Sequence, residues 1–165
     1  MTLLAVENVS KAFGGVHAIE GLSFDIRPGA VHSIIGPNGA GKTTLFNVVT
    51  GQLAASSGSV AFLGSDITSL PPHRRARAGL GRTFQIASLF PHLAVSDNLL
   101  LAANAPGLLS IGAAQAAERA AKALAICGLE DRRGAIVSTL SYGEQRRLEI
   151  ALALAAEPKM LLLDE

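Results

Sequence analysis

The residues with the clearest chemistry form one glycine-rich run in the first third of the chain. This run reads Gly36, Pro37, Asn38, Gly39, Ala40, Gly41, Lys42, Thr43 and Thr44, which fits a nine-position phosphate-binding loop. Val31 to Ile35 predicts a buried strand before it, and Thr43 to Val49 predicts a helix that begins under it and stops near Gly51. Because the first N–H groups of a helix lack intrahelical partners and carry positive potential, such a loop can enclose an anion. The run therefore predicts binding of a nucleoside triphosphate.

Each residue type in this run suits one part of a triphosphate. The three glycines allow backbone angles and a close approach that a Cβ atom would block. We expect Lys42 to reach the β- and γ-phosphates, Thr43 to offer its hydroxyl to Mg²⁺, and Thr44 to face the α-phosphate. A glycine-rich turn that carries Lys-Thr by chance is the alternative, and the predicted strand and helix on either side count against it.

Composition limits the other functions. The chain has 165 residues, of which 49% are hydrophobic and 16% charged, enough for one packed domain. A net charge of +1 gives no broad reason to expect nucleic acid as a partner, and the clustered Arg74, Arg75 and Arg77 are interpreted as a solvated helix face. The single cysteine, Cys127, excludes an intramolecular disulfide and is expected to fill the core.

One long uncharged segment, Leu99 to Ala117, approaches the roughly 20 residues that span a bilayer. Polar and turn-forming residues interrupt it, including Asn104, Pro106 and Gly107. Val95 to Ala103 and Ala113 to Ala125 are helical by composition. We therefore expect two helices and a loop here, and membrane contact only through a partner protein.

Two acidic residues close the chain after an apolar run. Met160 to Leu163 predicts a buried parallel strand, and Asp164 and Glu165 follow at its carboxyl end, where ligands of open α/β sheets bind. This is the form of a Walker B element. We expect Asp164 to hold Mg²⁺ and Glu165 to orient the water that attacks the γ-phosphate. A strand that ends in a solvated Asp-Glu pair is common, so the hypothesis depends on the glycine-rich loop upstream.

A third element opens the last long helix, Tyr142 to Ala156. Ser141 and Glu144 have the spacing of a capping box, whose side chains satisfy free N–H groups at a helix start. A capped start that leaves Gly143 exposed is also an anion site, and it could receive a γ-phosphate held by another subunit. The residues alone allow both interpretations.

Taken in order along the whole chain, the glycine-rich loop, Gln85, the run Leu140 to Arg147 and the closing acidic strand resemble the ATP-binding cassette (ABC) family. The resemblance implies an α/β fold: a P-loop NTPase core, a small N-terminal antiparallel β lobe (Leu3 to Val9 and Val16 to Ile26) and a helical signature subdomain. The implied boundaries within this partial ATP-binding domain, 1–165, are a core at 1–86, a helical subdomain at about 87–157 and a Walker B strand at 159–165.

The resemblance also implies roles for individual residues. Gln85 looks like the glutamine that contacts Mg²⁺ or the attacking water and couples the site to the transport partner. Phe13 is placed where the family stacks an aromatic ring on adenine, with core packing as the alternative. Two such domains would sandwich two ATP molecules, each site joining the loop of one subunit to Ser141 and Gly143 of the other.

Finer features resemble the ATPase subunits of branched-chain amino acid importers, namely the runs Phe13–Val16, Asp66–Thr68, Leu70–Arg74 and Gly81–Gln85 and the signature, with its unusual Tyr142 and Glu144. The implied partners are a second ATPase subunit, in a homo- or heterodimer, and integral membrane permease subunits. A periplasmic or extracellular solute-binding protein follows by family analogy, and the implied location is the cytoplasmic face of the cell membrane.

The family continues beyond the acidic strand, with further strands and a histidine that contacts the γ-phosphate. The histidines of this chain all precede the signature. We therefore expect the N-terminal part of a longer ATPase, with the C-terminal strands missing and hydrolysis by this part alone impaired. The alternatives are a nucleotide-binding fragment that does not hydrolyse and a soluble, non-transport ABC protein; the segment between Gln85 and the signature is too short for the coiled coil of the DNA-repair members.

Overall fold

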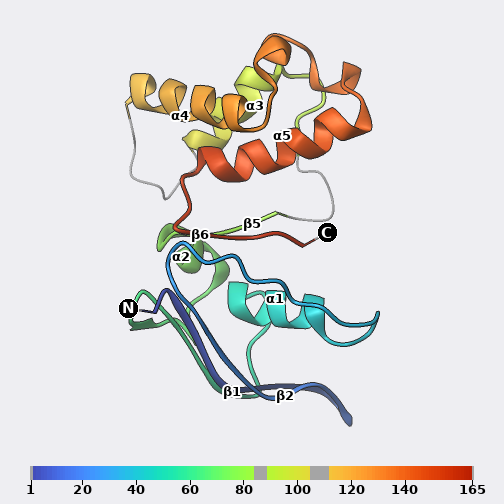
Figure 1. Cartoon of the computed structure of the whole chain (residues 1–165), viewed down its shortest axis with the longest axis vertical. Coiled ribbons are helices and arrows are strands. Elements are labelled where there is room, and N and C mark those ends of the chain that lie inside the picture. The colour runs from blue at the N-terminus through green and yellow to red at the C-terminus, as the bar shows by residue number, and fades with distance from the viewer. Residues whose placement is uncertain (1, 84–88, 105–111, 165) are drawn as a thin grey trace. The chain divides into compact units, whose positions relative to one another are not determined.

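The computed structural model describes residues 2–83, 89–104 and 112–164. They form two compact units, unit 1 (Met1–Ala78) and unit 2 (Gly79–Glu165), coloured blue to green and green to red in Figure 1. The predictions for Gln85 and Glu165 lie outside the described residues.

Unit 1 contains the expected antiparallel β lobe. Its sheet has the order β2-β1-β3-β4, with β1 at Leu4–Phe13, β2 at Val16–Ile26, β3 at Ser57–Phe62 and β4 at Ser65–Asp66. The Gly14-Gly15 turn joins β1 to β2, and Gly14 has a φ of 58°, which favours glycine. Leu4 pairs with Phe62 and Val6 with Val60, and these four side chains are buried together in the core.

The helix predicted after the glycine-rich run is α1, Lys42–Thr50. It buries Leu45, Val48 and Val49, at the i, i+3 and i+4 spacing of one helix face. Gly51, with a φ of 80°, ends the helix in the left-handed conformation, as predicted.

The strand predicted at Val31 to Ile35 does not form, so this prediction was wrong. Residues 31–35 have no strand assignment, and Val31 and Ile35 are 96% and 93% exposed. An apolar run of this kind is stable as a strand only where neighbouring strands supply its hydrogen bonds and other elements cover both faces. No described strand of unit 1 pairs with residues 31–35; its sheet consists of β1 to β4 alone.

The three clustered arginines do not share a solvated face, which corrects a second prediction. They lie on the short helix α2, Pro72–Arg77, where Arg74 and Arg77 are exposed but Arg75 is only 3% exposed. The Arg75 guanidinium donates hydrogen bonds of 2.8 Å to the carbonyl oxygens of Val48, Val49, Thr68 and Leu70. Two of these carbonyls belong to the last turn of α1, where intrahelical partners are lacking. Arg75 therefore caps the C-terminal end of α1.

Unit 2 combines a parallel strand pair with a helical layer. Strands β5, Leu80–Arg82, and β6, Met160–Leu162, pair in parallel, so that Arg82 lies opposite Leu162. The longer helices are α3 at Val95–Ala103, α4 at Ala113–Ile126 and α5 at Tyr142–Ala155, with 3₁₀ turns η1 at Glu130–Arg132 and η2 at Val137–Thr139. The predicted helices are thus confirmed to within a few residues.

Small side chains allow the helices of unit 2 to pack closely. Ala116, Ala120 and Ala123 of α4 are buried in one cluster with Leu148 and Ala151 of α5. The half-buried Cys127 packs against this cluster, and burial raises the pKa of its thiol, as expected for a cysteine that fills the core.

Helices α3 and α4 divide the long uncharged segment. The first ends at Ala103 and the second begins at Ala113. Among the described residues, none of the helices has both the length and the apolar character needed to cross a membrane.

Candidate nucleotide-binding site

Glycine is required at two positions of the loop at residues 36–41. Gly39 and Gly41 have φ values of 83° and 85°, in the left-handed region that other residues rarely adopt. Gly41 caps the start of α1 and has no side chain to bond the free N–H groups there. A Cβ atom on Gly41 would collide with the carbonyl oxygen of Ala18 in β2. The end of the loop therefore rests on β2, with the helix start open to an anion.

Lys42 folds back over the beginning of the loop. Its Nζ donates to the carbonyl oxygens of Gly36 and Pro37 at 2.7 and 2.8 Å, which places the ammonium group beside the loop backbone. The first turn of α1 contains no acidic residue, and Thr43 is exposed. The Lys42 ammonium group and the positive N-terminal end of α1 therefore both favour binding of an anion.

Phe13 is the last residue of β1. It pairs with Val16 across the turn, two residues before the Ala18 carbonyl that Gly41 approaches. The ring is 48% exposed, and Lys11 Nζ lies 5.1 Å from its centroid. Phe13 therefore does not pack in the core, and in Figure 1 the β1–β2 turn lies on the same side of unit 1 as the loop before α1.

Asp164 is buried in an ion pair that the sequence did not predict. Its Oδ2 accepts a hydrogen bond of 2.7 Å from Arg82, and both side chains are 8% exposed. The pair follows from the parallel register, because Arg82 is opposite Leu162 and Asp164 comes two residues later. A buried carboxylate of this kind depends on its partner charge.

The expected metal ligands are oxygen donors of the type that Mg²⁺ prefers, a hydroxyl at Thr43 in unit 1 and a carboxylate at Asp164 in unit 2. The arginine at Asp164 Oδ2 leaves Oδ1 of the same carboxylate as a further acceptor. No group of three or more His, Cys, Asp and Glu side chains that could hold a metal gathers within the described ranges. The donor chemistry thus fits Mg²⁺ better than a softer metal.

The predicted capping box at the start of α5 is confirmed. Glu144 Oε2 accepts from the backbone N–H and from the hydroxyl of Ser141, both at 2.8 Å, while the Glu144 N–H donates to Ser141 Oγ at 3.4 Å. Oε1 accepts from Arg132 Nε of η1 at 2.7 Å. These hydrogen bonds, with those from Ser141 the largest influence, lower the pKa of Glu144 to about 2.

The start of α5 is open to solvent. Gly143 is exposed and a Cβ atom there would meet nothing within 4 Å, and the Tyr142 ring beside it is 74% exposed. Arg146 lies 5.8 Å from the centre of that ring and pairs with Glu149 at 2.7 Å. A charged group of another molecule could therefore approach this helix end.

Comparison with known proteins identifies the same family as the sequence resemblance. The ABC transporter family model matches residues 19–165. The lipopolysaccharide export system ATP-binding protein LptB of Escherichia coli K12 is 41% identical over 165 residues, which cover 100% of this chain and 68% of LptB. The high-affinity branched-chain amino acid transport ATP-binding protein LivG of Salmonella typhimurium is 39% identical over 175 aligned residues, which cover 99% of this chain and 69% of LivG.

Solved structures show the same fold. The ADP conformation of MJ1267, an ATP-binding cassette of an ABC transporter, superposes with a TM-score of 0.86 at 37% identity, covering 98% of this chain and 67% of that one. The cbiO1 protein of Clostridium perfringens, part of the transporter complex cbiONQ, gives 0.88 at 32% identity, covering 99% of this chain and 65% of that one.

The fold and the glycine-rich loop define a P-loop NTPase with an antiparallel β lobe and a helical subdomain. The chain belongs to the ABC transporter family. It is an ATP-binding subunit of a membrane transporter, from a family whose ATPases hydrolyse ATP, dimerise and work with membrane permease subunits.

Proposed function

We propose that this chain binds ATP at residues 36–44 and hydrolyses it as one half of a dimer that powers a membrane importer. The observation that carries the proposal is the loop geometry. Gly39 and Gly41 adopt left-handed backbone angles, and the loop ends against Ala18 at an uncapped helix start with Lys42 beside it. A loop backbone that can surround an anion, a positive helix end and a lysine are the groups that usually bind the phosphates of a nucleoside triphosphate.

The remaining residues take the roles that the sequence suggested. The residues that cradle the phosphates are Gly36, Pro37, Asn38, Gly39, Ala40, Gly41, Lys42, Thr43 and Thr44. Phe13 stacks on the adenine, which its exposed ring at the end of β1 supports. Glu165 and Gln85 position the attacking water, and Ser141 and Gly143 contact the ATP of the partner subunit; the open, uncrowded start of α5 supports this last role.

Thr43, Gln85 and Asp164 would hold Mg²⁺, which supplies charge neutralisation on the β- and γ-phosphates when bound. Asp164 is paired with Arg82 in the structure. Its carboxylate thus already has a cationic partner at 2.7 Å.

For the transported solute we propose branched-chain amino acids. Support comes from the runs Asp66–Thr68 and Gly81–Gln85 and from LivG at 39% identity. A specific observation favours a second candidate, lipopolysaccharide export: LptB is 41% identical, and its alignment spans 165 positions against 175 for LivG. An importer would add a solute-binding protein outside the membrane to the permease and the second ATPase, with this subunit at the cytoplasmic face.

Two assays test the proposal. ATP turnover by the purified chain, with Lys42→Ala as background, tests hydrolysis; we expect turnover well below that of a complete domain. Uptake of labelled leucine, isoleucine and valine by cells that carry Lys42→Ala tests the solute. Loss of uptake supports import of these amino acids. Normal uptake with lipopolysaccharide lost from the cell surface would replace them with the second candidate.

A further inference from the structure

We propose that Arg132 is a positioning residue for the signature of this chain. It binds the Glu144 carboxylate, which in turn fixes the hydroxyl of Ser141. It also offsets the negative charge of Glu144 at the start of α5. The inference rests on the proposed role of Ser141 toward the ATP of the partner subunit, which it deepens.

The contacts form a chain from Arg132 to Ser141. Arg132 Nε donates to Glu144 Oε1 at 2.7 Å, and the other carboxylate oxygen, Oε2, accepts from the Ser141 N–H and hydroxyl at 2.8 Å each. Because a carboxylate is planar, a partner that fixes one oxygen also fixes the direction of the other. The guanidinium thus restricts the rotamer of Glu144, and Glu144 restricts that of Ser141.

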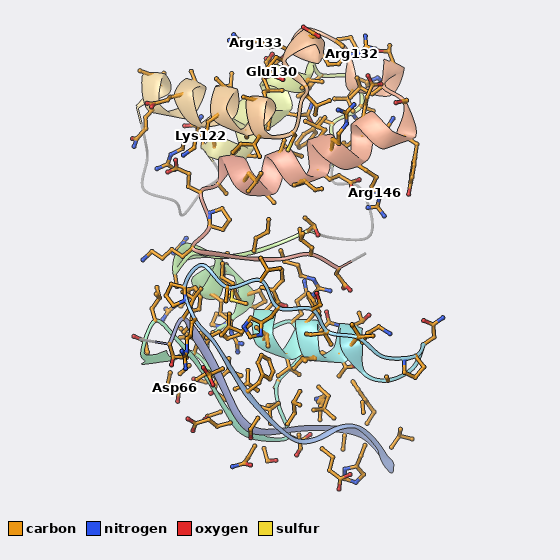
Figure 2. The ribbon with its side chains drawn as sticks, viewed as in Figure 1. Asp66, Lys122, Glu130, Arg132, Arg133 and Arg146 are labelled. Atoms are coloured by element: carbon orange, nitrogen blue, oxygen red, sulfur yellow. The ribbon has the colours of Figure 1, made fainter. Side chains whose placement is uncertain are left out.

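Arg132 acts from an anchored position. Its backbone N–H donates to the carbonyl oxygen of Leu129 at 2.9 Å, and Leu129 is 1% exposed in the core of unit 2. Arg147, on the second turn of α5, donates at 3.0 Å to the carbonyl oxygen of Gly128. In Figure 2 Arg132 lies on the segment above α5, and Arg146 lies on the other side of that helix. The first two turns of α5 are therefore tied to η1 through Glu144 and to the segment before η1 through Arg147.

The charge of Glu144 explains why a partner is needed. A carboxylate in the first turn is favoured by the helix dipole, but it would repel a phosphate that approaches the same turn. Arg132 supplies the compensating positive charge, and it leaves the face of Gly143 open. A glutamine at position 144 would form the same capping box without a net charge. The need for Arg132 therefore depends on the glutamate.

A double-mutant cycle tests this dependence. Arg132→Ala is compared in the natural background and in Glu144→Gln, with Arg133→Ala as the matched control. Arg133 is the exposed neighbour, and its side chain makes no hydrogen bond or ion pair within the part of the chain that the structure describes. Two properties are measured: the hydrogen-exchange rate of the Ser141 amide and the association of two chains driven by Mg²⁺-ATP. Arg132→Lys, which keeps the charge, is included in case Arg132→Ala folds poorly.

We expect Arg132→Ala to speed exchange at Ser141 and to weaken ATP-driven association, each about 5-fold. In Glu144→Gln the same change has less than about a 2-fold effect, because the charge that Arg132 offsets is gone. Arg133→Ala stays within about 2-fold. Arg132→Lys keeps most of the association and loses part of the exchange protection, since it retains charge but not the guanidinium geometry.

Equal effects of Arg132→Ala in the two backgrounds would overturn the proposal, because a general loss of stability does not depend on the residue at position 144. An effect no larger than that of Arg133→Ala would overturn it as well. If the unmutated chain shows no ATP-driven association while the exchange cycle behaves as expected, Arg132 positions Ser141 and it is the proposed role of Ser141 toward the partner subunit that fails.

Discussion

Removal of the buried Arg75 guanidinium should destabilise unit 1 strongly, whereas removal of its neighbour Arg74 should not. Arg75 is 3% exposed, and its four hydrogen bonds of 2.8 Å all go to backbone carbonyl oxygens. Two of these bonds close the C-terminal end of α1, the helix that begins at the glycine-rich loop. Arg75→Ala thus deprives several buried carbonyls of their partner.

The magnitude follows from the carbonyls that are left without a hydrogen bond. Val48 O retains the N–H of Gly51 at 3.1 Å, so the loss falls mainly on Val49, Thr68 and Leu70. At about 1 to 1.5 kcal/mol for each unsatisfied buried carbonyl, Arg75→Ala should lower the free energy of unfolding by about 3 to 5 kcal/mol. Arg74→Ala, on the same helix and exposed, should change it by less than about 0.5 kcal/mol.

Hydrogen exchange followed by mass spectrometry is the appropriate assay, because it reports on α1 separately from unit 2. Peptides covering residues 42–50 should exchange faster in Arg75→Ala by a factor that matches the lost free energy, while those of α4 and α5 should not change. Arg75→Lys should give an intermediate result, since one ammonium cannot reach all four carbonyls. An Arg75→Ala protein within 1 kcal/mol of Arg74→Ala would refute this reasoning.

Three further predictions concern the site. Gly41→Ala should destabilise the loop by at least about 1 to 2 kcal/mol and abolish nucleotide binding, which thermal unfolding and a nucleotide titration would measure; an unchanged melting temperature would contradict it. Phe13→Ala should weaken ATP binding about 5-fold or more at unchanged stability, because its ring is exposed; equal affinity would remove Phe13 from the adenine site. The pKa of Glu144 is lowered to about 2, so the ionised Glu144 should stabilise α5 fully above its ordinary pKa near 4.5 and progressively less as the pH falls from there toward 2. The hydrogen-exchange rate of the Ser141 amide, corrected for its intrinsic pH dependence, should report this loss. A corrected rate that stays constant over this pH range would contradict the prediction.

Local patterns predicted the helices well. The bounds of α3 were predicted from composition and the end of α1 from a turn residue, Gly51, and the Ser141–Glu144 capping box was found from spacing alone. These features depend on interactions within a few residues, which the sequence displays directly.

Features that depend on distant partners were not predictable in this way. Val31 to Ile35 has the composition of a buried strand, but a strand needs neighbours that no local pattern supplies. The sequence does not show that Arg75 is buried and Arg74 exposed, because this difference arises only from the contact of Arg75 with the C-terminal end of α1. The Arg82–Asp164 pair joins positions 82 residues apart, and only the parallel register of β5 and β6 brings them together. Arg132 was missed for the same reason.

The central claim is that residues 36–44 bind the phosphates of ATP, and a titration of the 165-residue chain with a fluorescent ATP analogue in Mg²⁺ tests it most directly. Lys42→Ala should weaken binding by about 10-fold or more, because a charge-assisted hydrogen bond to phosphate is lost. Lys122→Ala, an exposed lysine of α4 (Figure 2), serves as the control and should bind as the unmutated chain does. Equal affinity of Lys42→Ala and Lys122→Ala would contradict the assignment of the loop.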